Sequence, residues 1–402
     1  MPSIDFDRMK PLSDRYIVVF RDEVSAPESD VFDFTRFHGI SPDFVYGSAF
    51  KGFAGIIPLE RLERIRKDPR VAFVSEDRKV SIERHRSSPT PAPASTQITP
   101  TGIDRINAEP SSARPNTGAG INVAVLDTGI DLRHPDLAAN IAGGKNCASG
   151  AGYGDRNGHG THAAGIIGAI NNNVGIVGVA PNVKLWSVRV LDSSGSGTWS
   201  SVICGIDFVT SKAPANGGSI TVANMSLGGT GSSDNNCGNT NSDALHKAIC
   251  RSRDAGVTYV VAAGNESDNA NNHVPAAYDD AVITVSALAD SNGTFGGGGP
   301  STSYGADDTF ASFSNYGPGV DIAAPGVNIL STWKGGTYNT ISGTSMATPH
   351  VTGAAALYIA THPGSSWAII RDALKSLGEP LGIDRTDPSG LHPEPVLRAD
   401  TL

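Results

Sequence analysis

Residues 343–350 read Gly343-Thr344-Ser345-Met346-Ala347-Thr348-Pro349-His350, and the small and apolar residues 351–360 follow them. This stretch predicts a loop that delivers one serine into the first turn of a helix, which packs through the small residues 353–356. Pro349 lacks the N–H that would bond the carbonyl of Ser345, so we expect a local break there. The unpaired N–H groups and the positive dipole end of the helix would favour negative charge beside Ser345. A lone serine here is usually a helix cap, so its role depends on other residues.

Two further segments supply the groups that activate a serine. Asp127 ends the apolar run 123–126 and begins Asp-Thr-Gly-Ile-Asp, and His159 opens a helix in Gly-His-Gly-Thr-His-Ala-Ala-Gly. A serine hydroxyl is a poor nucleophile near pH 7 unless an imidazole takes its proton, and a carboxylate must orient that imidazole. Each residue stands at a strand exit or a helix entrance, where distant residues can converge.

Apolar strands alternate with helices around these three segments. We predict strands at 121–126, 184–191, 221–225, 258–262, 282–286 and 320–322, and helices that begin near His159, Thr198, Ser242, Ser345 and Ser365. Continuously apolar strands between helices predict a parallel sheet covered on both faces, with the chemistry at the carboxyl ends of the strands. We expect loops in the glycine-rich stretches 143–160 and 292–305.

The first 83 residues have a different pattern. They predict strand, helix, strand, strand, helix and strand at 16–20, 28–37, 44–50, 53–57, 59–67 and from 71 onward. This order is typical of the split βαβ motif. Residues 84–99 lose this periodicity and contain prolines among Ser and Thr, which predicts an exposed, cleavable linker.

Composition limits the classes of function. The chain has 402 residues, of which 39% are hydrophobic and 18% charged, and its net charge is −9. Residues 1–86 contain equal numbers of acidic and basic residues, so the excess acid lies in the larger part and disfavours nucleic acid as a partner. The sequence contains no run of about 18 apolar residues, so we expect no membrane-spanning helix. The first ten residues lack the apolar core of a signal peptide.

The three segments resemble the Asp, His and Ser blocks of the subtilisin-like serine proteases, in the order of that family. The resemblance runs from about Gln97 to about Gly378. The order excludes the chymotrypsin arrangement, and the serine motif is not the G-x-S-x-G elbow of α/β-hydrolases. The resemblance implies an α/β fold, a subtilisin-like parallel sheet with helices on both faces, preceded by a small α+β propeptide domain (split βαβ, ferredoxin-like). We expect a propeptide at 1–83, a linker with the processing site at 84–95, a catalytic domain at 96–380 and a C-terminal tail at 381–402.

The same resemblance implies a secreted endopeptidase that is made as an inhibited precursor and cuts itself. Asp127, His159 and Ser345 would form the catalytic triad, and Asn265 would supply the oxyanion-hole donor beside the Ser345 N–H. An extended peptide would add as a strand between two segments. Together with the expected pocket for the residue before the cleaved bond, these supply the substrate-binding residues Gly195, Ser196, Gly197, Ser226, Leu227, Gly228, Ala262, Ala263 and Gly264. No acid or base stands among them, so we expect a preference for apolar or aromatic residues.

Calcium is the cofactor that the resemblance implies, because a family calcium site recurs here as a carboxylate, amide oxygens and loop carbonyls. The expected ligands are Gln97, Asp136, Ile170, Asn172, Val174 and Ile176. His159 and His162 also have H-x-x-H spacing, but no carboxylate lies between them and no third ligand is evident, which disfavours zinc.

Several alternatives stay open. Cys237 could bond Cys250, but Cys204 competes for it, and Cys147 completes the set. The processing site lies anywhere between about 82 and 96. A non-catalytic protein that holds peptides in the cleft is the competing function, and the missing signal peptide leaves an intracellular relative as a third. The expected partners are protein substrates and the chain's own propeptide, and we expect a monomer that binds neither nucleic acid nor membrane.

Overall fold

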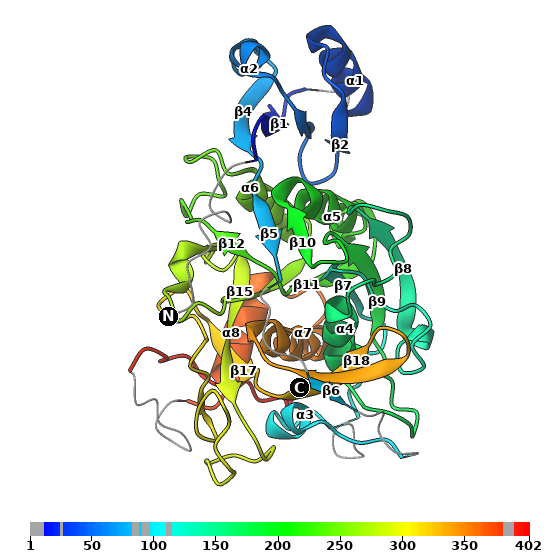
Figure 1. Cartoon of the computed structure of the whole chain (residues 1–402), viewed down its shortest axis with the longest axis vertical. Coiled ribbons are helices and arrows are strands. Elements are labelled where there is room, and N and C mark those ends of the chain that lie inside the picture. The colour runs from blue at the N-terminus through cyan, green and yellow to red at the C-terminus, as the bar shows by residue number, and fades with distance from the viewer. Residues whose placement is uncertain (1–11, 25–26, 83–87, 91–95, 110–114, 381–389) are drawn as a thin grey trace.

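The computed structural model describes residues 12–24, 27–82, 88–90, 96–109, 115–380 and 390–402. A small N-terminal unit is stacked on a larger one along the long axis of the molecule (Figure 1). The small unit contains β1 (Arg15–Phe20), α1 (Pro27–His38), β2 (Pro42–Tyr46), β3 (Gly52–Ile56), α2 (Leu59–Arg66) and β4 (Val71–Glu76). Its antiparallel sheet has the order β2-β3-β1-β4, so the expected split βαβ unit is confirmed.

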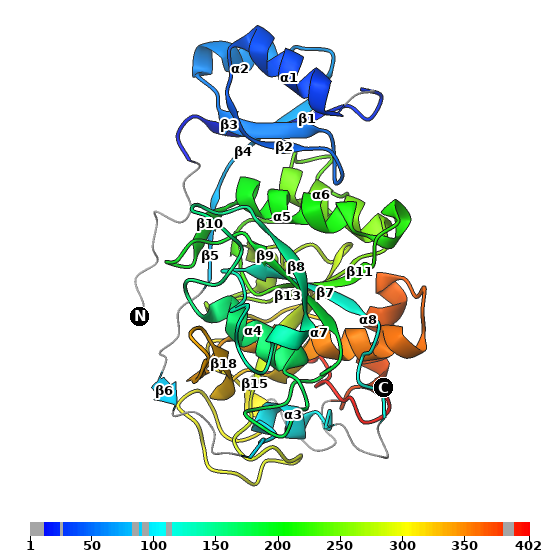
Figure 2. The same ribbon diagram turned by 90° about the vertical axis from the view of Figure 1, so that its right-hand side faces the viewer.

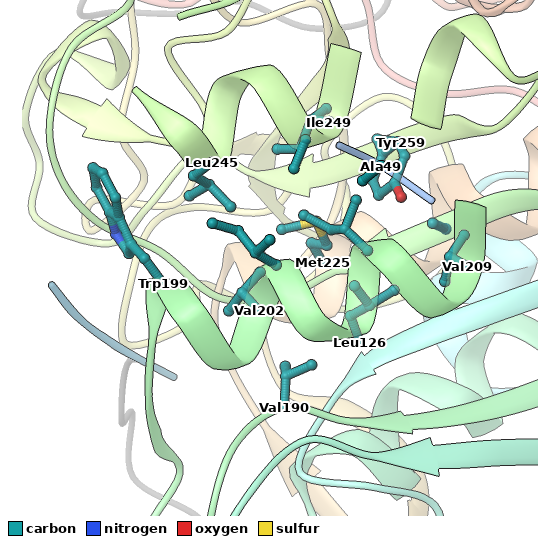
Figure 3. Packing of buried hydrophobic residues seen from close by; sticks show 14 of the residues in the cluster. Ala49, Leu126, Val190, Trp199, Val202, Val209, Met225, Leu245, Ile249 and Tyr259 are labelled. Carbon is teal, nitrogen blue, oxygen red and sulfur yellow. The ribbon is translucent and has the colours of Figure 1, made fainter. Parts of the chain in front are cut away.

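Side chains of β1 alternate between two cores, because successive residues of a strand point to opposite faces. Val18 and Phe20 pack against α1 and α2, whereas Ile17 and Val19 belong to the core of the larger unit. Figure 2 accordingly shows the small sheet between α1 and α2 on one side and α5 (Trp199–Ser211) and α6 (Ala244–Asp254) on the other. In Figure 3, Ala49 of the small unit lies among buried side chains of the larger unit.

The large sheet is mostly parallel, as expected. Its order is β16-β15-β13-β11-β7-β9-β8, with β17 also paired to β15, and only the β15–β16 pair is antiparallel. The strands are β7 (Asn122–Asp127), β8 (Ile141–Asn146), β9 (Lys184–Arg189), β11 (Ile220–Met225), β13 (Thr258–Ala262), β15 (Val282–Ala289), β16 (Thr309–Phe310) and β17 (Ile322–Pro325).

Helices cover both faces of this sheet. α5 and α6 pack on one face and α4 (His159–Gly168) and α7 (Thr344–Thr361) on the other, with α8 (Trp367–Leu377) against α7. Strand β7 is apolar on both sides because it contributes to two cores. Ala124 and Leu126 belong to one core, and Val123 and Val125 belong to the other. The other elements are α3 (Thr101–Arg105), the 3-10 helices Ala138–Asn140, Pro214–Asn216 and Ala270–Asn272, and the strands of the small sheets β5 (Lys79–Ser81), β6 (Ser88–Thr90), β10 (Ser196–Thr198), β12 (Gly229–Thr230), β14 (His273–Val274), β18 (Ile329–Trp333) and β19 (Thr337–Ile341).

The prediction of a loop from residue 143 onward is wrong for its first residues, which belong to edge strand β8. A side chain at Gly143 would collide with Trp186, and one at Gly144 with Tyr153. Both glycines therefore make room for aromatic rings, and they do not mark a turn.

Residues 390–402, part of the expected C-terminal tail, pack into the larger unit. Val396 pairs with Ala323 of β17 and with Glu379, and Ala399 donates a backbone hydrogen bond to Ile106. Val396, Leu397 and Ala399 are almost completely buried. Among the described residues, no helix has the length and apolar character needed to cross a membrane.

Candidate active site

Asp127 and His159 meet at the carboxyl end of β7. Asp127 is the last residue of this strand and is completely buried, and His159 is the first residue of α4. The Nδ1 atom of His159 lies 2.9 Å from both carboxylate oxygens of Asp127. This contact makes Nδ1 the protonated nitrogen and leaves Nε2 as a proton acceptor. Nε2 is buried and has no hydrogen-bond partner among the described residues.

Ser345 is buried in the first turn of α7 and is tied to the end of β11. Its hydroxyl donates to the carbonyl of Ser226 at 3.3 Å, while the Ser226 hydroxyl donates to the Ser345 carbonyl at 2.9 Å. The helices α4 and α7, which carry His159 and Ser345, pack against one another. The expected hydrogen bond from the Ser345 hydroxyl to His159 is not made, because that hydroxyl is turned toward Ser226.

Asn265 lies beside the start of α7. Its side-chain oxygen accepts from the backbone N–H of Thr344 at 2.8 Å and from the Thr344 hydroxyl at 3.0 Å. These bonds fix the amide plane and use its only acceptor, so the Nδ2 group remains as a donor next to the residue that precedes Ser345. That arrangement can stabilise negative charge on a bound carbonyl oxygen.

Sequence reasoning missed Asp155, which ties the Asp127 segment to the His159 helix. One carboxylate oxygen accepts from the Thr128 hydroxyl and the N–H groups of Asn157 and Gly158, and the other accepts from the N–H and hydroxyl of Thr161. Its place four residues before the helix start was the available signal.

The predicted substrate segments flank the end of the small unit. β5 pairs antiparallel with β10, and Ser81 exchanges backbone hydrogen bonds of 3.3 and 3.4 Å with Gly228 (Figure 1). The N–H of Ile82 donates to the carbonyl of Gly195 at 2.9 Å. Gly195 has φ +79°, and any side chain there would collide with that of Ile82. Residues 79–82 therefore occupy the groove as an added strand.

Most of the other residues that were predicted to bind substrate line a pocket next to Ser345. It is lined by Leu227, Gly228, Gly229, Ala262, Ala263, Gly264, Asn265, His273, Val274, Ala276, Thr344 and Ser345. Its wall is apolar apart from Asn265, His273 and the two hydroxyls. His273 is itself bonded through Nε2 to Asp268 at 3.1 Å.

The predicted calcium ligands gather around Asp136. The Nε2 group of Gln97 donates to the carbonyls of Ile170 and Ile176 at 2.7 and 2.9 Å, which brings three expected ligand residues together. One oxygen of Asp136 accepts from Ile176 N–H and Tyr338 hydroxyl, whereas the other is buried and without a partner among the described residues. An orphaned buried carboxylate oxygen beside backbone carbonyls fits a hard cation.

Two of the expected ligand residues, Asn172 and Val174, have side chains that do not point clearly to metal binding. The side-chain oxygen of Asn172 accepts from the N–H of Val174, and the Val174 side chain is exposed. A side chain at Gly175, where φ is +63°, would collide with Asp136 and Tyr338. Only glycine therefore allows the loop backbone to lie this close to Asp136.

His162 has no role as a partner of His159 in zinc binding. Its Nε2 group donates to the carbonyls of Ile329 and Asn339 at 3.0 and 3.1 Å. Complete burial, and then the nearby His159, lower the pKa of His162 to about 3, so the ring is neutral. It holds α4 against β18 and β19.

Two disulfides answer the question of cysteine pairing. Cys147 after β8 bonds Cys204 on α5, and Cys237 bonds Cys250 on α6. Cys204 therefore does not compete for Cys250.

Two carboxylates hold the small unit on α5, the buried Asp77 and the partly exposed Asp207. Asp77 accepts from the N–H and hydroxyl of Ser200, and Asp207 accepts from the N–H groups of Gly47, Ser48 and Ala49 at 3.1, 2.7 and 2.8 Å. Burial raises the pKa of both carboxyls, while the hydrogen bonds that they accept lower it.

Comparisons with known proteins agree on both units. The sequence profile of the Subtilase family matches residues 118–385, and that of Peptidase inhibitor I9 matches residues 15–83. Subtilisin NAT of Bacillus subtilis subsp. natto is 37% identical over 377 residues, covering 92% of this chain and 86% of the relative. An alkaline protease of Alkalihalobacillus alcalophilus is 39% identical over 333 residues, covering 83% of this chain and 75% of the relative. The crystal structure of a cold adapted subtilisin-like serine proteinase aligns with a TM-score of 0.60 at 36% identity, covering 76% of this chain and 99% of that one.

Proposed function

Because the chain belongs to the subtilase family, as a serine endopeptidase with an N-terminal inhibitor domain, we propose that Asp127, His159 and Ser345 form its catalytic triad. The observation that carries this proposal is the buried contact of His159 Nδ1 with both oxygens of Asp127. That contact leaves Nε2 free to accept a proton, on a helix that packs against the helix carrying Ser345.

In the proposed mechanism, the Ser345 hydroxyl leaves the Ser226 carbonyl and gives its proton to Nε2 of His159 as it attacks the peptide carbonyl. Asp127 stays ionised and stabilises the imidazolium. The Nδ2 group of Asn265 and the N–H of Ser345 donate to the oxyanion. His159 then protonates the leaving amine, and water releases the acyl-enzyme by the reverse transfers.

The small unit would act as an inhibitor that becomes cleaved. Its residues 79–82 fill the groove as a substrate would. We place the propeptide at 1–83, the linker with the processing site at 84–95, the catalytic domain at 96–380 and the tail at 381–402. Self-cleavage would then fall between Ile82 and residue 96.

The pocket beside Ser345 supports broad specificity with a preference for apolar or aromatic residues before the cleaved bond. Its alanine, glycine, leucine and valine wall offers no fixed charge to pair with Lys or Arg. Gly195, Ser196, Gly197, Ser226, Leu227 and Gly228 would bind the peptide backbone on either side.

Gln97, Asp136 and the carbonyls of Ile170 and Ile176 would hold a structural Ca²⁺, with Asn172 and Val174 completing the loop. When bound, the ion would neutralise the buried Asp136 charge and cross-link the chain near residue 97 to the 170–176 loop. The ion takes no part in the reaction.

Two disulfides support an extracellular location, because such bonds persist in oxidising compartments. We expect a monomer whose partners are protein substrates and its own propeptide.

The Ser345→Ala chain tests the triad and self-cleavage together. Expressed in the same host as the unchanged chain, it should accumulate at full length, whereas the unchanged chain should be cut between residues 82 and 96. The unchanged, matured protein should also react with a fluorophosphonate at Ser345. Maturation of the Ser345→Ala chain in a host without other proteases would refute self-cleavage by this triad. Absence of labelling at Ser345 would favour a protein that only holds peptides.

A further inference from the structure

A second cluster of metal-ligating side chains lies outside the groove, at the base of α6. Cys237, His246, Cys250 and Asp280 each place one ligand atom within 4.8 Å of the others. His246 and Cys250 stand one helical turn apart on α6 and are buried, while Cys237 comes from the preceding loop and Asp280 from the turn before β15. The two sulfurs are bonded to one another here, so the cluster holds no thiolate.

His246 is oriented as a metal-ligating histidine usually is. Its ring is completely buried and stacks on Tyr278 at 4.0 Å between centroids. Nε2 bonds Asp280 at 2.6 Å, and Nδ1 lies 3.3 Å from a carboxylate oxygen of Asp234. Nδ1 is also a buried atom that no described residue satisfies with a well-formed hydrogen bond. Metal-bound histidines commonly present their second nitrogen to a carboxylate, which fixes the ring.

We propose that reduction of the Cys237–Cys250 disulfide converts this cluster into a tetrahedral Zn²⁺ site. A dithiol reductant attacks one sulfur, which breaks the S–S bond and forms a mixed disulfide; its second thiol then displaces the other cysteine. The reductant loses two electrons and becomes a cyclic disulfide, and two protein thiols form. On binding, Zn²⁺ displaces one proton from each thiol, with one ring nitrogen of His246 and one oxygen of Asp280 as the other ligands.

The donor set favours zinc over calcium, because thiolate and imidazole are soft ligands and a single carboxylate completes four positions. Bonds of about 2.0–2.3 Å require ligand atoms about 3–4 Å apart. The two sulfurs would therefore move apart from their bonded distance. The ligand atoms that are now up to 4.8 Å from one another would move closer together. Asp234 would remain outside the metal and hold the second histidine nitrogen.

Cys237 belongs to the loop between β12 and α6. Gly229 of β12 lines the pocket beside Ser345, and β12 pairs with β14, which lines the same pocket. The disulfide attaches this loop to α6 under oxidising conditions. The zinc site would keep the same attachment when the disulfide is reduced.

The experiment uses the full chain with Ser345→Ala, which removes the proposed nucleophile and so prevents self-digestion, while the cobalt signals themselves do not depend on the proposed mechanism. The protein is reduced in the absence of air with a water-soluble phosphine, which becomes the phosphine oxide with oxygen from water. Co²⁺ then serves as the spectroscopic probe. One equivalent should produce the visible absorption of tetrahedral cobalt and a sulfur-to-cobalt charge-transfer band, and Zn²⁺ should displace it. The unreduced protein should give neither signal.

Matched variants assign the site. Cys147→Ser with Cys204→Ser removes the other disulfide and should leave both cobalt signals unchanged. Cys237→Ser with Cys250→Ser should abolish them, and His246→Gln should weaken binding at least about 10-fold. The proposal is overturned if reduced protein with an unchanged circular dichroism spectrum shows no charge-transfer band. It is equally overturned if reduction unfolds the protein, or if the band survives in the Cys237→Ser, Cys250→Ser chain.

Discussion

Asp155 illustrates how one side chain can position a reaction without touching it. Its two oxygens accept five hydrogen bonds from Thr128, Asn157, Gly158 and Thr161, on both sides of the Asp127–His159 pair. Removing this carboxylate would leave backbone N–H groups of the loop before His159 without an acceptor. The loop would then relax, and with it the direction of the imidazole.

We therefore expect Asp155→Ala to lower kcat by about 10²-fold, since small displacements of reacting groups have effects of this size. KM should change little, because the groove at Gly195 and Gly228 is formed by other segments. Peptide hydrolysis and melting temperature would be measured together. Asp155→Asn keeps one acceptor oxygen and should recover part of kcat.

Asp372→Ala is the matched control, because this aspartate is exposed and, within the described part of the chain, its one ion pair is with its neighbour Arg371. Equal turnover of the Asp155→Ala and Asp372→Ala enzymes would refute the positioning role. So would a loss of kcat that follows the loss of thermal stability alone.

Buried neutral histidines set the response to acid. Burial lowers the pKa of His350 to about 4, and that of His162 to about 3. Below about pH 6.5 the unfolded chain binds protons that the folded chain excludes. The free energy of unfolding should therefore be highest above this pH and fall as the pH approaches 4, by up to about 1.4 kcal/mol per pH unit for each histidine.

Comparison of His350→Gln with the unchanged residue, both in the Ser345→Ala chain, isolates this contribution. Glutamine can still donate to the Met346 carbonyl that His350 Nδ1 contacts at 2.8 Å, but it does not titrate. The melting temperature of the glutamine variant should decline less between pH 7 and pH 4.5. Asp290, whose pKa burial raises to about 6, acts in the opposite direction and cancels in the comparison. Parallel pH curves for both chains would contradict the assignment.

At the scale of elements, α5 is the main docking surface for the inhibitor domain. Asp207 on this helix accepts from three successive N–H groups at 47–49, and hydrogen bonds to a charged group contribute about 1.5–3 kcal/mol each. Asp207→Ala should therefore weaken inhibition by the cleaved propeptide about 10-fold or more. The lag before full activity appears, followed with a peptide substrate after self-cleavage, should shorten.

Arg251→Ala tests whether any contact between the units would have the same effect. Arg251 pairs with Asp22 of the propeptide, but both side chains are largely exposed, and exposed pairs contribute little. The lag of the Arg251→Ala enzyme should match that of the unchanged enzyme. A lag shortened equally by both substitutions would contradict a specific role for the three hydrogen bonds that Asp207 accepts.

Elements were predictable where the local signal and the tertiary environment agree. Thr198 was expected to start a helix, and it caps α5 through the backbone N–H of Ser201. Ser366 likewise caps α8, one residue from the expected start. Edge strand β8 was missed because Gly143 and Gly144 are usual loop residues, and the reason for them lies in tertiary contacts with Trp186, Tyr153 and the carbonyl oxygen of Ser187. The pairing of Cys147 with Cys204 was equally hidden, since it depends on β8 lying beside α5.

At the scale of the whole molecule, the chain near Gln97 is joined to the candidate calcium loop 170–176, which lies between α4 and β9. Gln97 bonds the 170–176 loop through both its side chain and its backbone, and Asp136 contributes an unpartnered oxygen. Addition of Ca²⁺ to the Ser345→Ala chain should raise its melting temperature by about 5 °C or more when the ion is at about 100 times its Kd. Chelation should reverse this shift.

Asp136→Asn should remove the calcium-dependent part of the shift, whatever it does to the stability of the metal-free chain. Asp131→Asn is a suitable control, because the Asp131 carboxylate accepts from the N–H groups of residues 335 and 336, whereas that of Asp136 accepts from Ile176 in the 170–176 loop. A calcium shift that persists in Asp136→Asn would place the ion elsewhere.

The architecture was predictable because strand and helix patterns alternate along most of the chain, and three short motifs then indicate which ends of the strands carry chemistry. Contacts between distant residues were predictable only where a motif marked both partners, as for Asp127 and His159. Asp155 has no motif of its own, the Ser345 hydroxyl is turned toward Ser226, and Val396 has no pattern that indicates β17 as its partner.

The position of residues 396–399 beside β17 and Ile106 has a consequence for biosynthesis. A ribosome adds these residues after all the described strands of the large sheet, so the contacts of Val396 with Ala323 and of Ala399 with Ile106 cannot form until those strands have been made. The inhibitor domain precedes the larger unit in the chain and is by then available to place residues 79–82 in the groove.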